Sequence, residues 1–325
     1  MKKQNENIKI LRPTDLYVKL SKYRIYGSSG GLCVGFETFK NKYTWGVGTC
    51  TDWTGHPTSG KSQIVLEFAM NVSIKHGVKH LLYMPDVGSN EEIVADLIHK
   101  YTGKTFDKRY PNHITENEMA EGLNWVTDHF LILEQNDLFS HLTPLEVWKK
   151  GIELKETDNI TSVIIDSWKD LYHNIVEFGR EDIYLAHTLK TRNKLAERHQ
   201  MHFHTVVHPT KPRTDGNGNP LPPTAYDLKG GSEWFNNAKT IIAVNRPDKD
   251  NNIAEIDIRK IKPRSLGKTG KYFLHFDMPK FRYYEEINGQ RCFAFEHKNI
   301  ELKPEHHPDR FIEPENETDI DELPF

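Results

Sequence analysis

Short apolar segments alternate with longer segments of helical periodicity between residues 46 and 277 of this 325-residue chain. The apolar segments predict strands at residues 48–53, 80–84, 130–133, 162–165, 203–208, 240–244, 253–258 and 272–276. Strands that are separated by crossover helices are typical of a mostly parallel sheet. The pattern therefore predicts an α/β fold with a central sheet flanked by helices.

The clearest predicted helix covers residues 61–76. Its apolar side chains recur at helical spacing, and Gly77 follows as a C-cap. The residues on the apolar face are Val65, Phe68, Ala69 and Val72. A second, short helix is predicted near the amino terminus, capped by Thr14 or Asp15.

The chain is predicted to consist of three parts: an N-terminal extension at residues 1–45, an α/β domain at 46–300 and an acidic tail at 301–325. Inside the domain, residues 209–231 are rich in proline, glycine and asparagine and form a connection longer than is usual. Long connections within compact domains are usually functional or mobile.

Composition excludes several classes of protein. Three widely spaced cysteines predict neither a disulfide framework nor a four-ligand zinc site. No apolar run is long enough for a signal peptide or a membrane span, which predicts a cytoplasmic protein with no membrane partner. The net charge of −3 argues against a wholly basic surface, but basic residues gather at positions 259–271. A local basic groove is therefore compatible with the composition.

The segment at residues 55–62, GHPTSGKS, has the Walker A pattern of a phosphate-binding loop. Backbone N–H groups of such a loop hold phosphates, Lys61 reaches the β- and γ-phosphate oxygens, and Ser62 binds Mg²⁺. The preceding strand and the following helix are the context that this motif requires. The predicted ATP-binding residues are Gly55, His56, Pro57, Thr58, Ser59, Gly60, Lys61, Ser62, Gln63 and Arg246.

Two aspartates follow predicted strands. Asp166 ends the apolar segment SVIID, the Walker B arrangement in which a carboxylate holds Mg²⁺. Asp86 comes just after the second strand and is a candidate for orienting the attacking water, with Glu91 and Glu92 as fallback candidates. For both aspartates the alternative is an ordinary turn residue.

Three histidines have even spacing in one segment, at His202, His204 and His208. Alternation along a strand would place all three on one face, which raises a zinc site as a possibility. No acid or cysteine nearby completes such a site, so we favour a single functional histidine. His208, at the strand end, is expected to face the γ-phosphate, with His202 and His204 half-buried.

The order of these motifs resembles the RecA-like core of the hexameric replicative helicases of the DnaB and Twinkle types, over residues 31–284. Three stretches carry the resemblance beyond the two Walker motifs: YMPD at 83–86, TVVHPTK at 205–211 and YDLKGGS at 226–232. The resemblance implies a P-loop NTPase fold and assigns Asp86 as the catalytic acid, where glutamate is usual. It also supports His208 as the γ-phosphate sensor.

The resemblance also implies roles outside the ATP-binding loop. Lys262 and Arg264 resemble a Lys-x-Arg pair that one subunit inserts into the ATP site of its neighbour. The alternative is a solvated basic edge. The expected contacts to single-stranded DNA are Lys211, Arg213, Lys229, Gly230 and Gly231. Residues 14–21 are a candidate for a helix that docks on the adjacent subunit.

The chain ends in an acidic segment closed by Leu323-Pro324-Phe325. Composition indicates disorder, with an inert solubilising tail as the plain alternative. The tip resembles that of bacterial single-stranded-DNA-binding proteins, whose terminal phenylalanine fills an apolar pocket of a partner. This implies recruitment of a primase, a polymerase or another replication protein.

Together these observations predict a Mg²⁺- and ATP-dependent DNA helicase motor of a phage or a mobile element, assembled as a ring that we expect to be a hexamer. Two alternatives stay open. One is a RecA-type recombination or repair ATPase, which forms filaments. The other is a KaiC-like regulatory ATPase or a ring-shaped loader that acts on proteins.

Overall fold

The computed structural model describes residues 10–26, 30–135, 141–210, 214, 221–247 and 252–296. Near the amino terminus, a 3-10 turn (Pro13–Leu16) leads into helix α1 (Tyr17–Tyr26). Both belong to a different compact unit from the one that begins at Gly31. The prediction of Thr14 or Asp15 as the cap was wrong: both lie inside the 3-10 turn, and the Asp15 carboxylate accepts the backbone N–H of Arg12, the N-cap.

The second unit is built on a mixed sheet. Its strands are β3 (Thr49–Thr54), β4 (His80–Tyr83), β5 (Phe130–Ile132), β6 (Ser162–Asp166), β7 (His202–Val206), β8 (Thr240–Asn245), β9 (Ile253–Lys260), β10 (Gly270–Asp277), β11 (Arg282–Ile287) and β12 (Gln290–Phe293). Their order across the sheet is β12-β11-β10-β9-β8-β3-β7-β6-β4-β5. Strands β1 (Leu32–Cys33) and β2 (Thr44–Trp45) pair with each other, separately.

The sheet has a parallel half and an antiparallel half. The strands from β8 through β3, β7, β6 and β4 to β5 are parallel, as predicted. From β8 to β12 every pairing is antiparallel, and the β11–β12 hairpin was not predicted. Buried charged residues in β11, Arg282 and Glu285, interrupt the apolar pattern that marks a strand in sequence. The eight predicted strands are all present, with ends shifted by no more than two residues.

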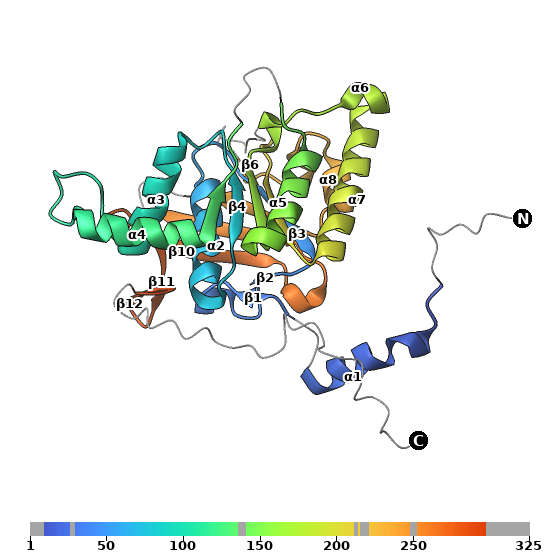
Figure 1. Ribbon diagram of the computed structural model, residues 1–325, viewed down its shortest axis with the longest axis horizontal. Helices are drawn as coiled ribbons and strands as arrows, with labels where there is room; N and C mark the ends of the chain where they lie inside the picture. Colours follow the sequence, from blue (N-terminus) through green and yellow to red (C-terminus); the bar gives the residue numbers. More distant parts are fainter. Residues whose placement is uncertain are drawn as a thin grey trace, which may run out of the picture. The chain divides into compact units, whose positions relative to one another are not determined.

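Helices cover both faces of the sheet (Figure 1). They are α2 (Lys61–His76), α3 (Asn90–Thr102), α4 (Glu116–His129), α5 (Pro144–Asp158), α6 (Ile175–Phe178), α7 (Glu181–His199) and α8 (Ser232–Asn237). Helix α2 has the predicted bounds and ends at Gly77, whose φ of +66° is left-handed. Capping boxes begin α3, α4 and α5, because Ser89, Thr115 and Thr143 each exchange hydrogen bonds with a glutamate three residues on.

Alternate strand residues point into two cores. Trp53, Leu82, Ile164 and Val206 pack with α2, α3 and α4 on one face of the sheet. Leu81, Val163, Ile165 and Phe203 pack on the other face with α5 and α7. Since α2 follows β3 directly, the first core fixes this helix against the sheet.

The segment before β3 closes the first core. Phe36 and Phe39 pack their rings against Phe68 of α2, with centroids 6.1 and 5.2 Å apart, and the Val34 carbonyl accepts from the Asn71 side chain. Helix α2 is therefore buried on nearly every side, more completely than a one-face apolar pattern implies. None of the helices in the described ranges has an apolar stretch long enough to cross a bilayer.

Candidate nucleotide-binding site

The loop between β3 and α2 has the shape of a phosphate cradle. A Cβ atom on Gly55 would lie 2.3 Å from the Val244 carbonyl oxygen, and Gly60 has a left-handed φ of +87°, so both positions require glycine. Lys61 begins α2, and its Nζ donates to the carbonyl of His56, 2.9 Å away on the same loop. The predicted residues 55–62 thus form one turn at the N-terminus of a buried helix, where anions bind favourably.

Three candidate residues follow adjacent parallel strands. Asp86 follows β4, Asp166 ends β6 and His208 follows β7, so all three reach the same edge of the sheet as the loop. One ligand atom from each lies within 4.8 Å of the others. The sequence predicted each of these residues; the structure brings them together.

Asp166 is the most deeply buried of the three, with 2% of its surface exposed. Burial raises its pKa to about 6, while a hydrogen bond from Ser62 and the charge of Lys61 oppose the rise. Its Oδ2 is buried without a hydrogen-bond partner among the described residues. A hard oxygen ligand left unsatisfied beside the Ser62 hydroxyl fits a Mg²⁺ ion or one of its waters.

Asp86 is held by two side chains. Lys169 Nζ donates to Oδ1 at 2.6 Å, and Nε2 of His208 lies 3.2 Å from Oδ2. Burial, followed by the charge of Lys61, lowers the pKa of His208, so the ring is neutral at pH 7. The sequence did not single out Lys169, although its place three residues after Asp166 was a usable signal.

The other two evenly spaced histidines do not join this site. His202 and His204 are fully buried, at 2% and 0% exposed, so the expectation that they are half-buried was wrong. His202 bonds Thr51 and His204 accepts from the indole of Trp53. Burial lowers the pKa of both, to about 3 for His202. They are core residues rather than metal ligands.

A cavity of about 390 Å³ opens beside the loop. Lys61, Ser62, Gln63 and Arg246 line it, as the sequence prediction of their nucleotide-binding role requires. One wall of the cavity consists of Phe276, Met278, Phe281 and Tyr283, from the end of β10 to the start of β11. Sequence reasoning missed this wall, because the wall comes near the loop only through the antiparallel half of the sheet.

Lys262 and Arg264 lie at the opposite edge of the sheet. Strand β8 is parallel to β3, whereas β9 runs back along β8 and pairs its last residue, Lys260, with Ile241. Lys262 and Arg264 follow and are exposed. They therefore cannot serve the ATP-binding loop of their own chain.

Lys229, Gly230 and Gly231 lie beside α7. Lys229 pairs with Glu181 at 3.3 Å, and Gly230 has a left-handed φ of +86° with a Cβ position only 2.3 Å from Leu185. An antiparallel bridge joins Leu228 to Pro209, the residue after His208. The base of the connection is thus tied to the candidate γ-phosphate sensor. Lys211, Arg213 and the tail at 323–325 lie outside the described residues.

Comparisons with known proteins bear on the family resemblance and the fold. No protein-family model matches the chain. The chain is 27% identical over 280 residues to the Twinkle homolog protein, chloroplastic/mitochondrial, of Arabidopsis thaliana, over 81% of this chain and 38% of that protein. The chain therefore spans well under half of the length of this curated relative.

Two solved structures share the fold. One is an isolated ATPase domain, which superimposes with a TM-score of 0.69 and 15% identity, over 85% of this chain and 99% of that one. The other is a DnaB-like replicative helicase, solved in a study of its interactions with primase. It superimposes with a TM-score of 0.64 and 17% identity, over 85% of this chain and 67% of that one. The predicted RecA-like α/β fold and the resemblance to DnaB-type and Twinkle-type helicase cores are confirmed.

Proposed function

We propose that this chain is an ATP-driven motor that moves along single-stranded DNA and unwinds duplexes, as part of the replication of a phage or a mobile element. The observation that carries the proposal is the convergence of Lys61, Asp166, Asp86 and His208 on one edge of the sheet, in a chain with the fold of a replicative helicase.

In this proposal the ATP phosphates bind in the loop at residues 55–60, and Lys61 turns from the His56 carbonyl to the β- and γ-phosphates. Ser62 and Asp166 would hold a Mg²⁺ ion, which would neutralise charge on the phosphates. The cavity beside the loop, which Arg246 and aromatic residues line, receives the base.

Asp86 orients the attacking water, and the neutral His208 turns its single N–H from Asp86 to the γ-phosphate. Lys169, whose Nζ lies 2.6 Å from Asp86, holds this carboxylate in place. Because His208 is followed at once by the bridge between Pro209 and Leu228, loss of the γ-phosphate contact shifts the base of the Lys229 connection. This linkage is our account of how hydrolysis moves DNA.

The site is completed by a second subunit. Lys262 and Arg264 are exposed at the edge opposite to their own ATP-binding loop, which suits insertion into the site of a neighbour in a ring. Exposed apolar side chains on α1, including Tyr17, Leu20 and Tyr23, provide a surface for contact with the adjacent subunit. A hexamer and recruitment of replication proteins by residues 323–325 remain predictions.

The test is ATP hydrolysis with and without single-stranded DNA, by the wild type, Lys61→Ala and Arg264→Ala. Both variants are expected to be inactive alone. Mixing them should restore part of the activity, because an intact loop in one subunit then meets an intact arginine from the other. Hydrolysis by Arg264→Ala alone, or no recovery on mixing, would contradict completion by a neighbour.

Two further measurements separate the alternatives. DNA affinity that falls steeply with salt favours a motor or a recombinase over a regulator that acts on proteins, because phosphate contacts release counterions. Unwinding of a forked duplex then distinguishes a helicase from a RecA-type recombinase.

A further inference from the structure

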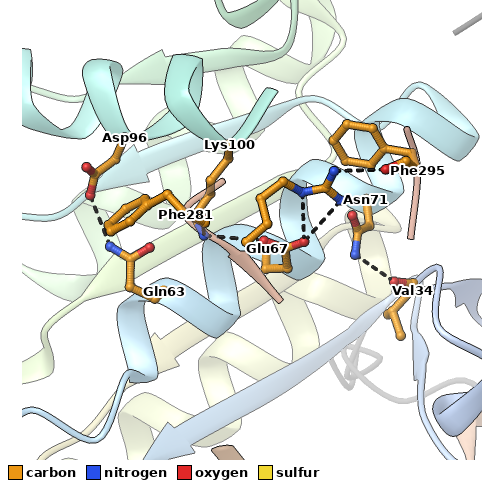
Figure 2. Close-up of polar contacts among 9 residues, drawn as sticks. Val34, Gln63, Glu67, Asn71, Asp96, Lys100, Phe281 and Phe295 are labelled. Atoms are coloured by element: carbon orange, nitrogen blue, oxygen red, sulfur yellow. Dashed lines mark hydrogen bonds and ion pairs between the residues drawn. The ribbon is translucent and has the colours of Figure 1, made fainter. Parts of the chain in front are cut away.

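A polar stripe runs along the buried helix α2, from Gln63 through Glu67 to Asn71 (Figure 2). These residues are four apart and so share one helical face. Gln63 donates to Asp96 of α3 at 3.0 Å, and Asn71 donates to the Val34 carbonyl. Glu67, between them, is completely buried.

Glu67 bridges two cations from different elements. Its Oε2 lies 3.3 Å from Nζ of Lys100 on α3, and its Oε1 lies 3.3 Å from Nη2 of Arg282 in β11. Lys100 is 0% exposed and Arg282 only 3%. One carboxylate thus joins the helix that follows the phosphate loop to α3 and to the antiparallel half of the sheet (Figure 2).

Lys100 also contacts the aromatic wall of the cavity. Its Nζ donates to the Phe281 carbonyl at 2.9 Å. The same ammonium lies 5.6, 5.1 and 5.8 Å from the ring centroids of Phe276, Phe281 and Tyr283, within the range of cation–π attraction. These three rings line the cavity beside the phosphate loop, whereas Lys100 itself does not reach it.

The turn that carries the wall needs such a support. Phe281 has a left-handed φ of +57°, a conformation that a bulky residue rarely adopts. Neighbouring residues of α3 hold its two ends: His99 bonds the Pro279 carbonyl and stacks on the Phe281 ring, and Lys100 bonds the Phe281 carbonyl. Helix α3 therefore determines the position of the Phe281 ring.

Stability alone is a weak reason for this arrangement. Removing the three charges of Glu67, Lys100 and Arg282 from water is unfavourable, and apolar replacements of buried ion pairs are often as stable. What an apolar residue cannot supply is the directed contact from Lys100 to a carbonyl and to three rings. The arrangement therefore favours a role in positioning.

We propose that Lys100, anchored by Glu67, is a positioning residue that sets the aromatic wall for a nucleobase, so that the chain recognises the base separately from the phosphates. This inference rests on the proposed function, because it requires a nucleotide in the phosphate loop. A flat, stackable ring is the ligand that the wall of Phe276, Phe281 and Tyr283 suits.

The test compares two ligands by calorimetry in the presence of Mg²⁺: a non-hydrolysable ATP analogue, and inorganic tripolyphosphate, which has no base. In Lys100→Met, the Kd for the analogue is expected to rise about tenfold, the effect of one lost oriented aromatic contact, while the Kd for tripolyphosphate stays the same. Phe281→Leu should give the same pattern, and the two changes together should be less than additive.

Two controls protect this test. Lys100→Met leaves the Glu67–Arg282 pair in place, so no buried carboxylate is stranded; if it does not fold, Lys100→Gln, which keeps a donor for the Phe281 carbonyl, replaces it. Lys104→Met changes a lysine just past the end of α3 that pairs with Glu118 and is not among the residues that line the cavity, and it should bind both ligands normally.

An unchanged Kd for the analogue in Lys100→Met would overturn the inference, and so would an equal loss for both ligands, because the effect would then lie in the phosphate loop. If the wild type binds neither ligand, the proposed function fails together with the inference. If the wild type binds the analogue and Lys100→Met binds it with the same Kd, the inference fails but the proposed function does not.

Discussion

Nε2 of His208 lies 3.2 Å from Oδ2 of Asp86, although 122 residues separate them in the chain. The contact forms above Asp166, because β6, which Asp166 ends, lies between the strands that lead to the other two residues. Adjacent parallel strands bring their carboxyl ends to one edge of a sheet, which is where ligands bind in such folds. The relationship explains why three residues far apart in sequence form one candidate site.

The assignment of the water-orienting acid can be tested with a matched pair of variants. Asp86→Asn is expected to lower kcat for ATP hydrolysis by about 10²- to 10⁴-fold with little change in ATP affinity, because the residue acts on the water rather than on binding. Steady-state kinetics and equilibrium nucleotide binding check the two parts.

Glu92→Gln is the control for that variant. Glu92 accepts from the backbone N–H of Ser89 in the capping box of α3. Weakening this hydrogen bond should lower the free energy of unfolding slightly and leave kcat unchanged. A large loss of kcat in Glu92→Gln, together with an active Asp86→Asn, would assign the orientation of the attacking water to Glu92 instead.

Removal of one partner from the buried pair of Asp52 and Arg192 is expected to destabilise the protein strongly. The guanidinium bonds both carboxylate oxygens, at 2.5 and 2.9 Å, and both residues are almost wholly buried. Arg192→Met leaves a buried carboxylate unpaired, which we expect to lower the free energy of unfolding by about 3–5 kcal/mol in urea denaturation.

Arg180→Ala provides the comparison, because Arg180 pairs with Asp182 in an exposed position, with 71% and 47% of the side chains accessible. This change should cost no more than about 0.5 kcal/mol. Similar losses in the two variants would contradict the large cost that we expect for an unpaired buried carboxylate.

The three buried histidines predict acid sensitivity. Burial lowers the pKa of His80 and of His202 from 6.5 to about 3, and that of His204 well below 6.5. Below pH 6.5 these histidines are protonated in the unfolded chain but not in the folded chain. The free energy of unfolding is therefore highest above that pH and falls as the pH drops. We expect a loss of about 1.4 kcal/mol per pH unit for each histidine, measured by urea unfolding from pH 7.5 to 4.5.

His202→Gln is the check on this slope. The variant loses a titrating group and can still bond Thr51, so its stability should decline less steeply with falling pH than that of the wild type. A wild-type stability that is the same at pH 7.5 and pH 5 would refute the prediction.

Lys229 is expected to contact DNA phosphates, in competition with its partner Glu181. Lys229→Ala should weaken binding to single-stranded DNA and reduce the slope of log K against log salt concentration by roughly 0.7, the value for one contact. Glu181→Gln should strengthen binding, since it releases the lysine. Fluorescence anisotropy over a range of salt concentrations measures both changes.

Lys150→Ala is a matched control, because Lys150 also forms an exposed lysine–glutamate pair, with Glu153 on α5, outside the expected DNA-binding segment. Its DNA affinity and salt slope should equal those of the wild type. An effect of Lys150→Ala as large as that of Lys229→Ala would indicate general surface charge rather than a specific contact.

Local signals in the sequence were sufficient for the parallel half of the sheet, for helix α2 to its last residue and for the phosphate loop. Apolar alternation, helical periodicity and the need for glycine at positions 55 and 60 act within a few residues, so a linear reading detects them. Lys61 was also identified by the Walker A pattern, and Asp86, Asp166 and His208 by their places at or just after the ends of strands.

Only the tertiary structure decided which side chains meet. The pairing of β8 to β12, the aromatic wall beside the phosphate loop, the contact of Lys169 with Asp86 and the burial of Glu67 with Lys100 and Arg282 all join residues that are distant in sequence. A charged residue in a sequence has the signature of a surface residue, because burial of a charge is favourable only when a partner arrives from elsewhere in the fold. That dependence on a distant partner is the physical reason why the linear pattern predicted the elements and the loop, while the walls and supports of the site required the folded chain.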